Sequence, residues 1–197
     1  MSIISFIKGM PQITFYLVRH GEAENNVLHI LNSAGAKKEY SLTEKGRAQA
    51  KQVAAYLATV GADALYSSPI LRAKETAEAI AETTGLLIQF DDRLWEVGMG
   101  RFNEQSQEEL LKKYPEPQMR LTPDTEDEME SILLVHGRLG SFLKEIKDKH
   151  TGQKVILVSH GDPLEQLHGI LTREGPGRAA EGWYPEKGSC TEVVWQY

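Results

Sequence analysis

The sequence predicts an α/β fold: a single domain of three layers, with a mostly parallel central sheet and helices on both faces. Short apolar, β-branched runs alternate along the chain with longer segments of helical periodicity, the pattern of a parallel sheet. The chain has 197 residues, of which 41 % are hydrophobic and 25 % charged, a size and composition suited to one compact unit. No internal repeat divides it.

The N-terminal half is expected to contain three strands and two helices. Residues 13–18 (ITFYLV) form a β-branched and aromatic run typical of a buried strand. Residues 43–60 carry apolar side chains at helical spacing, and residues 64–67 predict a second strand. A second helix over residues 68–85 is expected to open with a serine cap followed by proline, before a third strand at 86–90.

The middle of the chain breaks this alternation. Three prolines interrupt short amphipathic pieces between residues 98 and 125, which predicts an insertion that lies over the sheet edge and covers the site. A longer helix is expected over residues 126–149. The acidic run 124–130 would lie at its N-terminus, where negative charge is favourable.

The C-terminal part returns to the alternation of strand and helix. Residues 155–159 (VILVS) form the most apolar predicted strand, and Asp162 and Pro163 open the next helix. Residues 172–188 are rich in glycine, proline and charge and are expected to form a loop. A basic lid built from Arg173, Arg178 and Lys187 is one option for this loop. Residues 191–195 predict the last strand.

The bulk properties restrict the class of function. The net charge is −6, so the molecule should repel nucleic acid, and an enzyme for anionic substrates must gather its cations locally. No stretch reaches the ~20 apolar residues that span a bilayer, and nothing near Met1 resembles a cleaved leader. A single cysteine, Cys190, excludes an intrachain disulfide and suits a reducing compartment. We therefore expect a cytoplasmic protein that binds neither nucleic acid nor membrane.

Charged side chains gather where predicted strands end. Arg19 and His20 follow the first strand, Arg72 lies in the first turn after the second, and His160 follows strand 155–159. Ligands of α/β sheets bind beyond the carboxyl ends of the strands, where helix N-termini add partial positive charge. Taken alone, Arg19 and His20 could lie in a solvated turn, Arg72 could be a surface arginine, and His160 could be a hydrogen-bonded core histidine. Their joint placement favours an anion site.

Five segments, in order, resemble the motifs of the histidine phosphatase superfamily, which contains the cofactor-dependent phosphoglycerate mutases. They are LVRHGEAENN (17–26), LTEKGRAQA (42–50), YSSPILRAKETA (66–77), RLWEVGMGRF (93–102) and VSHGDPL (158–164). The match covers most of the chain, and the five motifs together are strongly specific. The resemblance implies a phosphoglycerate mutase-like fold with residues 1–197 as one histidine phosphatase domain.

The resemblance also implies which side chains form the site. The residues implied to be catalytic are His20, Glu96, His160, Arg19 and Arg72. The residues implied to bind substrate are Arg19, Asn26, Arg72, His160 and Gly161. No metal and no cofactor are expected, because the cationic side chains supply the charge. Asn25 replaces an aromatic residue of the family pattern, and Asn103-Glu104 stands where many members have Glu-Gly, so substrate identity stays open.

These residue types suit phosphoryl transfer. A neutral imidazole can attack phosphorus if its other nitrogen is held by an acceptor, and a backbone carbonyl in the turn after His20 is the expected one. Arg19 and Arg72 offer planar forks for phosphoryl oxygens, and His160, if protonated, would add a third cation. Glu96 would protonate the leaving oxygen, which requires a raised pKa.

The favoured interpretation is a metal-independent phosphatase that hydrolyses a phosphomonoester through a phosphohistidine on His20. The alternative is a cofactor-dependent phosphoglycerate mutase, which the modest length of insertion 98–125 disfavours. A non-catalytic module that binds a phosphorylated ligand is less favoured, because it would be expected to have lost His20 or Glu96. The expected partner is a small phosphorylated substrate, with sugar phosphate, nucleotide, phosphoglycerate and phosphoprotein all open, and a homodimer remains an option.

Overall fold

The computed structural model describes residues 10–176 and 182–197 and contains a five-stranded sheet in the order β3-β2-β4-β1-β5. The strands are β1 (Gln12–Arg19), β2 (Ala64–Ser67), β3 (Ile88–Phe90), β4 (Lys154–Ser159) and β5 (Cys190–Gln196). The pairs β1–β4, β4–β2 and β2–β3 are parallel, whereas β5 runs antiparallel to β1 at the edge. The predicted α/β class with a mostly parallel sheet is confirmed.

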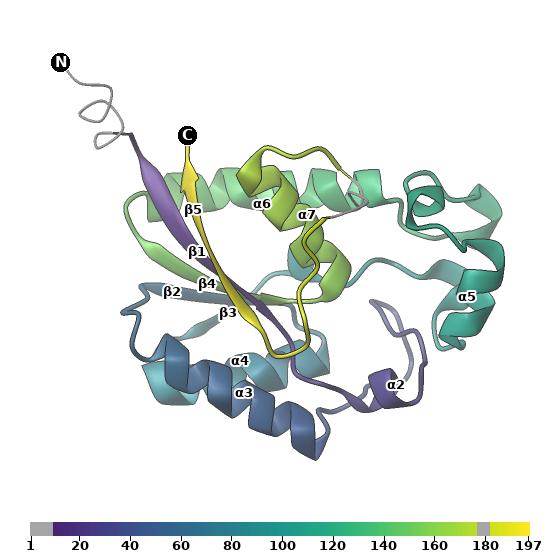
Figure 1. Cartoon of the computed structure of the whole chain (residues 1–197), viewed down its shortest axis with the longest axis horizontal. Helices are drawn as coiled ribbons and strands as arrows, with labels where there is room; N and C mark the ends of the chain where they lie inside the picture. The colour runs from purple at the N-terminus through teal and green to yellow at the C-terminus, as the bar shows by residue number, and fades with distance from the viewer. Residues whose placement is uncertain (1–9, 177–181) are drawn as a thin grey trace.

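Helices cover both faces of the sheet (Figure 1). They are α2 (Glu24–Val27), α3 (Glu44–Leu57), α4 (Leu71–Thr84), α5 (Gln107–Lys113), α6 (Ile132–His150) and α7 (Gly161–Thr172). Short 3₁₀ helices occupy Asp92–Leu94, Gly100–Phe102, Pro117–Arg120 and Thr125–Asp127. In Figure 1, α3 and α4 lie on one face, α6 and α7 on the other, and α2 and α5 beyond the strand ends.

Side chains alternate between the two faces along each inner strand. On β1, Phe15 and Leu17 enter the core shared with α6 and α7, while Tyr16 and Val18 enter the core shared with α3 and α4. Because both faces are covered, the inner strands are apolar almost throughout. Polar chemistry is therefore left to the carboxyl ends of the strands.

The predicted opening of α4 is wrong. The helix starts at Leu71, and its N-cap position is Ile70, which makes no side-chain capping bond. The Ser68 hydroxyl instead lies 2.8 Å from Nε2 of His160, so a long-range contact takes the group that local sequence would assign to a cap. The predicted end is confirmed, because Gly85 adopts the left-handed conformation there with φ of 74°.

The predicted start of α6 is also wrong. The helix begins after Ser131, whose hydroxyl accepts a hydrogen bond from the backbone of Leu134. The acidic run 124–130 lies outside the helix, and its member Asp127 is buried in ion pairs with Arg101 and Lys113. The positive charges of Arg101 and Lys113, rather than a helix dipole, therefore compensate the negative charge of Asp127.

The segment expected to be an insertion over the sheet edge packs into the main core. Phe102, Leu110 and Tyr114 belong to the same apolar cluster as β1 and α6. Backbone hydrogen bonds tie it to the loop after α2, for example from Gln107 N to the carbonyl of His29 at 2.8 Å. The chain is thus a single α/β domain.

Two sequence-based expectations fall on residues that the structure does not describe. Residues 1–9, where no cleaved leader is expected, lie outside the described ranges, and so does Arg178 of the expected basic lid. Within the described ranges, the helices lack the combination of length and apolarity needed to cross a membrane.

Candidate active site

The strand ends converge on a pocket of about 500 Å³. Arg19 ends β1 and His20 follows it, Arg72 comes from the first turn of α4, and Glu96 comes from the loop after β3; all four line the pocket. His20 and Arg72 are each only 2 % exposed, so these polar groups are held in a largely dry environment. Such burial strengthens electrostatic interactions and makes side-chain geometry decisive.

The hydrogen bonds of His20 assign its protonation. Nδ1 lies 2.7 Å from the carbonyl oxygen of Gly21. Because a carbonyl only accepts, Nδ1 carries the proton, and Nε2 presents a lone pair that accepts from Nε of Arg72 at 3.0 Å. Burial, with the positive charges of Arg72 and Arg19, holds the pKa of His20 well below its usual range. The expected backbone carbonyl acceptor is confirmed, and the ring is neutral.

Asn32 holds Arg72 in place. Nη1 of Arg72 donates to the side-chain oxygen of Asn32 at 2.8 Å, and Nη2 donates to the Asn32 carbonyl at 2.9 Å. Burial lowers the pKa of Arg72 to about 10, which leaves the guanidinium charged at neutral pH. Sequence reasoning did not find Asn32, since no local pattern distinguishes it in the loop between two motifs.

Arg19 is positioned by the loop before β5. Its Nη1 donates to the carbonyl of Pro185 at 2.7 Å, and its guanidinium carbon lies 5.1 Å from the ring centroid of Tyr184. Its Nε is buried and has no hydrogen-bond partner among the described residues. A buried donor of this kind is suited to an oxygen atom of a bound ligand.

His160 lies behind His20 rather than at the pocket surface. It is fully buried, and the two ring centroids are 5.1 Å apart. Burial, followed by the charge of Arg72, holds the pKa of His160 well below its usual range, so the ring is neutral and is not the third cation considered above. Its Nδ1 is a second buried atom without a partner in the described part of the chain.

Glu96 is arranged to exchange a proton near neutral pH. Burial and the nearby Asp162 carboxylate raise the pKa of Glu96 to about 7, although Arg72 and Arg19 oppose the shift. One carboxyl oxygen accepts a hydrogen bond from the backbone of Val97 at 3.0 Å. A carboxyl group with this pKa can donate a proton and later accept one.

A family model described as histidine phosphatase superfamily, branch 1, matches residues 15–197. The chain belongs to the histidine phosphatase superfamily. The resemblance indicated by the five sequence motifs is therefore confirmed.

Relatives in the superfamily carry different names. Phosphoserine phosphatase 1 of Hydrogenobacter thermophilus is 32 % identical over 163 residues, which cover 81 % of this chain and 76 % of that protein. Probable phosphoglycerate mutase GpmB of Escherichia coli is 34 % identical over 153 residues, which cover 76 % and 70 %. The structure of Bacillus stearothermophilus YhfR superposes with a TM-score of 0.79 at 28 % identity, covering 91 % of this chain and 90 % of that one. The superfamily and these relatives indicate phosphatase or mutase chemistry.

Asn26 and Gly161, which the family resemblance implies as substrate contacts, have structural contacts of their own. Asn26 lines the pocket, and its side-chain oxygen accepts from the backbone of Ala23 at 3.1 Å. Gly161 begins α7 behind the pocket, and a Cβ there would overlap the hydroxyl of Tyr184. Asn26 therefore borders the space for substrate, whereas glycine at 161 makes room for the tyrosine beside Arg19.

Asp162 joins two outer segments of the site that sequence reasoning did not connect. Arg120 donates to one carboxylate oxygen at 3.1 Å, and the Tyr184 hydroxyl donates to the other at 3.1 Å. Asp162 thereby holds both segments close to the pocket and places negative charge near Glu96.

Among the side chains of residues 10–176 and 182–197, no three His, Cys, Asp or Glu are grouped to hold a metal ion. Glu22 bonds Thr43 and Lys45, so it orders the turn after β1 rather than facing the pocket.

Proposed function

We propose that this histidine phosphatase hydrolyses a small phosphomonoester without a metal ion, through a phosphohistidine on His20. The observation that carries the proposal is the protonation pattern of His20. Its Nδ1–H is held by Gly21, so the Nε2 lone pair is directed to the guanidinium of Arg72 at the pocket wall. A neutral imidazole in this orientation is a competent nucleophile.

In the first half-reaction, Nε2 of His20 attacks phosphorus, and the bond between phosphorus and the ester oxygen breaks. Arg72 turns its Nε–H from His20 to a phosphoryl oxygen, and the unpaired Nε–H of Arg19 meets another. In such sites, each hydrogen-bond donor directed at charge that develops in the transition state typically lowers the activation free energy by ~3–4 kcal/mol. Protonated Glu96 gives its proton to the leaving alcohol oxygen.

His160 contributes a neutral hydrogen bond. The Ser68 hydroxyl accepts from the backbone of Ile70 at 3.3 Å and lies 2.8 Å from Nε2 of His160, and we assign its own proton to that nitrogen. Nδ1 of His160 then carries the ring proton and has no partner in the described part of the chain. This N–H belongs to a ring behind His20 that does not line the pocket, whereas Asn26 borders the space for substrate and Gly161 makes room for Tyr184.

In the second half-reaction, the Glu96 carboxylate accepts a proton from water as the water oxygen attacks phosphorus. The bond between Nε2 and phosphorus breaks, inorganic phosphate is released, and both His20 and Glu96 return to their starting protonation. The pKa of Glu96, about 7, supports both directions of transfer.

A cofactor-dependent phosphoglycerate mutase is the second candidate, because a 34 % identical relative is named as a probable one. In that case the phosphohistidine would pass its phosphoryl group to a bound intermediate instead of to water. The relative named phosphoserine phosphatase 1 supports the hydrolytic outcome.

The deciding experiment measures release of inorganic phosphate from para-nitrophenyl phosphate with a chelator present. Turnover that persists in chelator and vanishes in His20→Ala is expected, with His136→Ala on α6 as the matched histidine control. An acid-labile phosphoryl label on wild type that is absent from His20→Ala would identify the intermediate. Full activity in His20→Ala would refute the proposal. Interconversion of phosphoglycerates that needs bisphosphoglycerate and releases no phosphate would assign the mutase.

A further inference from the structure

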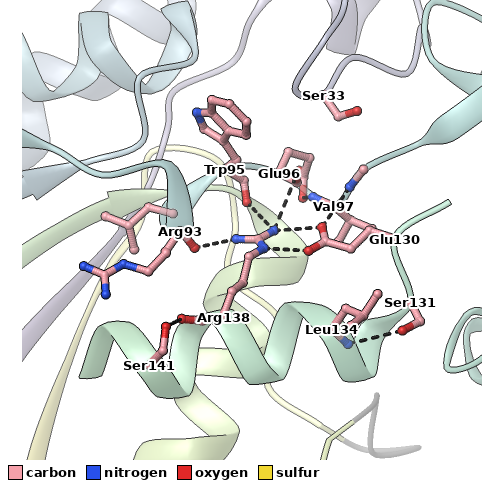
Figure 2. Close-up of polar contacts among 12 residues, drawn as sticks. Ser33, Arg93, Trp95, Glu96, Val97, Glu130, Ser131, Leu134, Arg138 and Ser141 are labelled. Carbon is pink, nitrogen blue, oxygen red and sulfur yellow. Dashed lines mark hydrogen bonds and ion pairs between the residues drawn. The ribbon is translucent and has the colours of Figure 1, made fainter. Parts of the chain in front are cut away.

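A guanidinium from α6 holds the loop that carries Glu96 (Figure 2). Arg138 donates from Nη1 to the carbonyl of Arg93 and from Nη2 to the carbonyl of Trp95 at 2.8 Å, with a longer contact of 3.5 Å to the carbonyl of Glu96. Arg93 belongs to the short 3₁₀ helix Asp92–Leu94, and Trp95 and Glu96 lie in the irregular segment that follows it. A planar group with five donors can satisfy several of these carbonyls at once.

Glu130 completes the arrangement from a position beside the guanidinium, as Figure 2 shows. Its carboxylate accepts from Nε of Arg138 at 2.7 Å and from Nη2 at 3.1 Å. The same carboxylate accepts from the backbone of Gly98 at 3.0 Å, and the Glu130 amide donates back to the Gly98 carbonyl at 2.8 Å. A Cβ at Gly98 would lie only 3.1 Å from Cβ of Glu130, so glycine permits this approach. The backbone is thus held both before and after Glu96.

The carboxyl of Glu96 follows its backbone closely. It accepts a hydrogen bond from the amide of the next residue, Val97, at 3.0 Å. Any shift of the loop therefore moves the carboxyl with it. A displacement of ~1 Å between reacting groups can cost ~10²-fold in rate.

We propose that Arg138 and Glu130 are positioning residues that fix Glu96 for proton transfer to the leaving group. The inference rests on the proposed function, in which Glu96 is the proton donor. Neither side chain lines the pocket, and their side chains are 18 % and 22 % exposed, so they act through the loop backbone. Lysine at 138 would keep the charge but not the planar set of donors.

The dependence of rate on the leaving group separates this role from a general loss of structure. Departure of para-nitrophenolate needs no proton, whereas departure of an alkoxide from glycerol phosphate does. The ratio of kcat/KM for the two substrates reports proton donation in the first half-reaction. Because both values come from one enzyme sample, the ratio does not change when part of a variant is unfolded.

The experiment compares wild type with Arg138→Met, Glu130→Gln and Glu96→Gln. For Arg138→Met we expect kcat/KM to fall ~10²-fold with glycerol phosphate and by less than ~3-fold with para-nitrophenyl phosphate. Glu130→Gln should change the ratio in the same direction. Adding Arg138→Met to Glu96→Gln should cause no further selective loss, because the two changes act on one proton transfer. The control, Lys149→Gln, removes an exposed ion pair on the same helix and should leave the ratio unchanged.

The outcomes are distinct. In one outcome, Glu96→Gln changes the ratio, but Arg138→Met and Glu130→Gln either lower kcat/KM equally for both substrates or leave both values unchanged. The positioning role is then wrong, and the proposed function stands. If Glu96→Gln itself leaves the ratio unchanged while His20→Ala is inactive, the assignment of Glu96 as donor fails, and the positioning role fails with it.

Discussion

Replacing Asn32 with alanine removes the oxygen that accepts from Nη1 of Arg72 at 2.8 Å. A hydrogen bond to a charged group is worth ~1.5–3 kcal/mol. Since ~1.36 kcal/mol corresponds to a tenfold change in rate, kcat/KM should fall ~10–150-fold. The second contact, from Nη2 to the Asn32 carbonyl at 2.9 Å, survives the substitution and favours the lower part of this range.

The assay is the initial rate of phosphate release across substrate concentrations, with circular dichroism and a thermal midpoint for each variant. Asn32→Asp is the companion variant: it keeps an acceptor for Arg72 but adds a negative charge beside the phosphoryl site, so KM should rise more than kcat falls. A folded Asn32→Ala enzyme whose kcat/KM stays within ~2-fold of wild type would refute the idea that Asn32 orients Arg72.

Two further predictions concern proton transfer and packing. With an alkyl phosphate, kcat/KM should decline as pH rises through about 7, because Glu96 must be protonated to donate and loses that proton above its raised pKa. The low pKa of His20 keeps the nucleophile neutral on the acidic side, so Glu96→Gln should abolish the decline at a level ~10²–10⁴-fold lower; a decline through about pH 7 that persists in this variant would count against Glu96 as the donor. Gly161→Ala should displace Tyr184 and destabilise the fold by ~1–3 kcal/mol in thermal or denaturant unfolding, with a raised KM. Gly137→Ala on α6, where a Cβ meets nothing within 4 Å, is the control and should be neutral or stabilising; equal effects of the two alanines would contradict the packing argument.

The four residues Arg19, His20, Arg72 and His160 could be found from the sequence because each follows a short apolar run. A parallel sheet brings such positions to one edge, so a local pattern predicts a long-range cluster. The protonation of His160 could not be predicted in the same way, because its neutrality follows from complete burial behind His20.

The wrong helix cap and the site residues that were missed have a common cause: their side chains contact residues far away in the sequence. Ser68 was expected to cap α4 but contacts His160, which is 92 positions away in the chain. Asn32 and Arg138 have no motif around them, and each acquires its role from a contact about 40 positions away. Local propensity places helices and strands well, but it contains no information on which buried donor will meet which carbonyl.

The pairing of β1 with β5 also affects how the protein is made. Arg19 and the Pro185 carbonyl that holds it are 166 positions apart, and β5 cannot join the sheet edge until residues 190–196 have left the ribosome. During synthesis at ~5–20 residues per second, His20 is therefore exposed for many seconds before the loop that orients Arg19 exists. Nascent chains should acquire affinity for phosphate late, in one step, and a stalled chain that ends before Tyr184 should lack it.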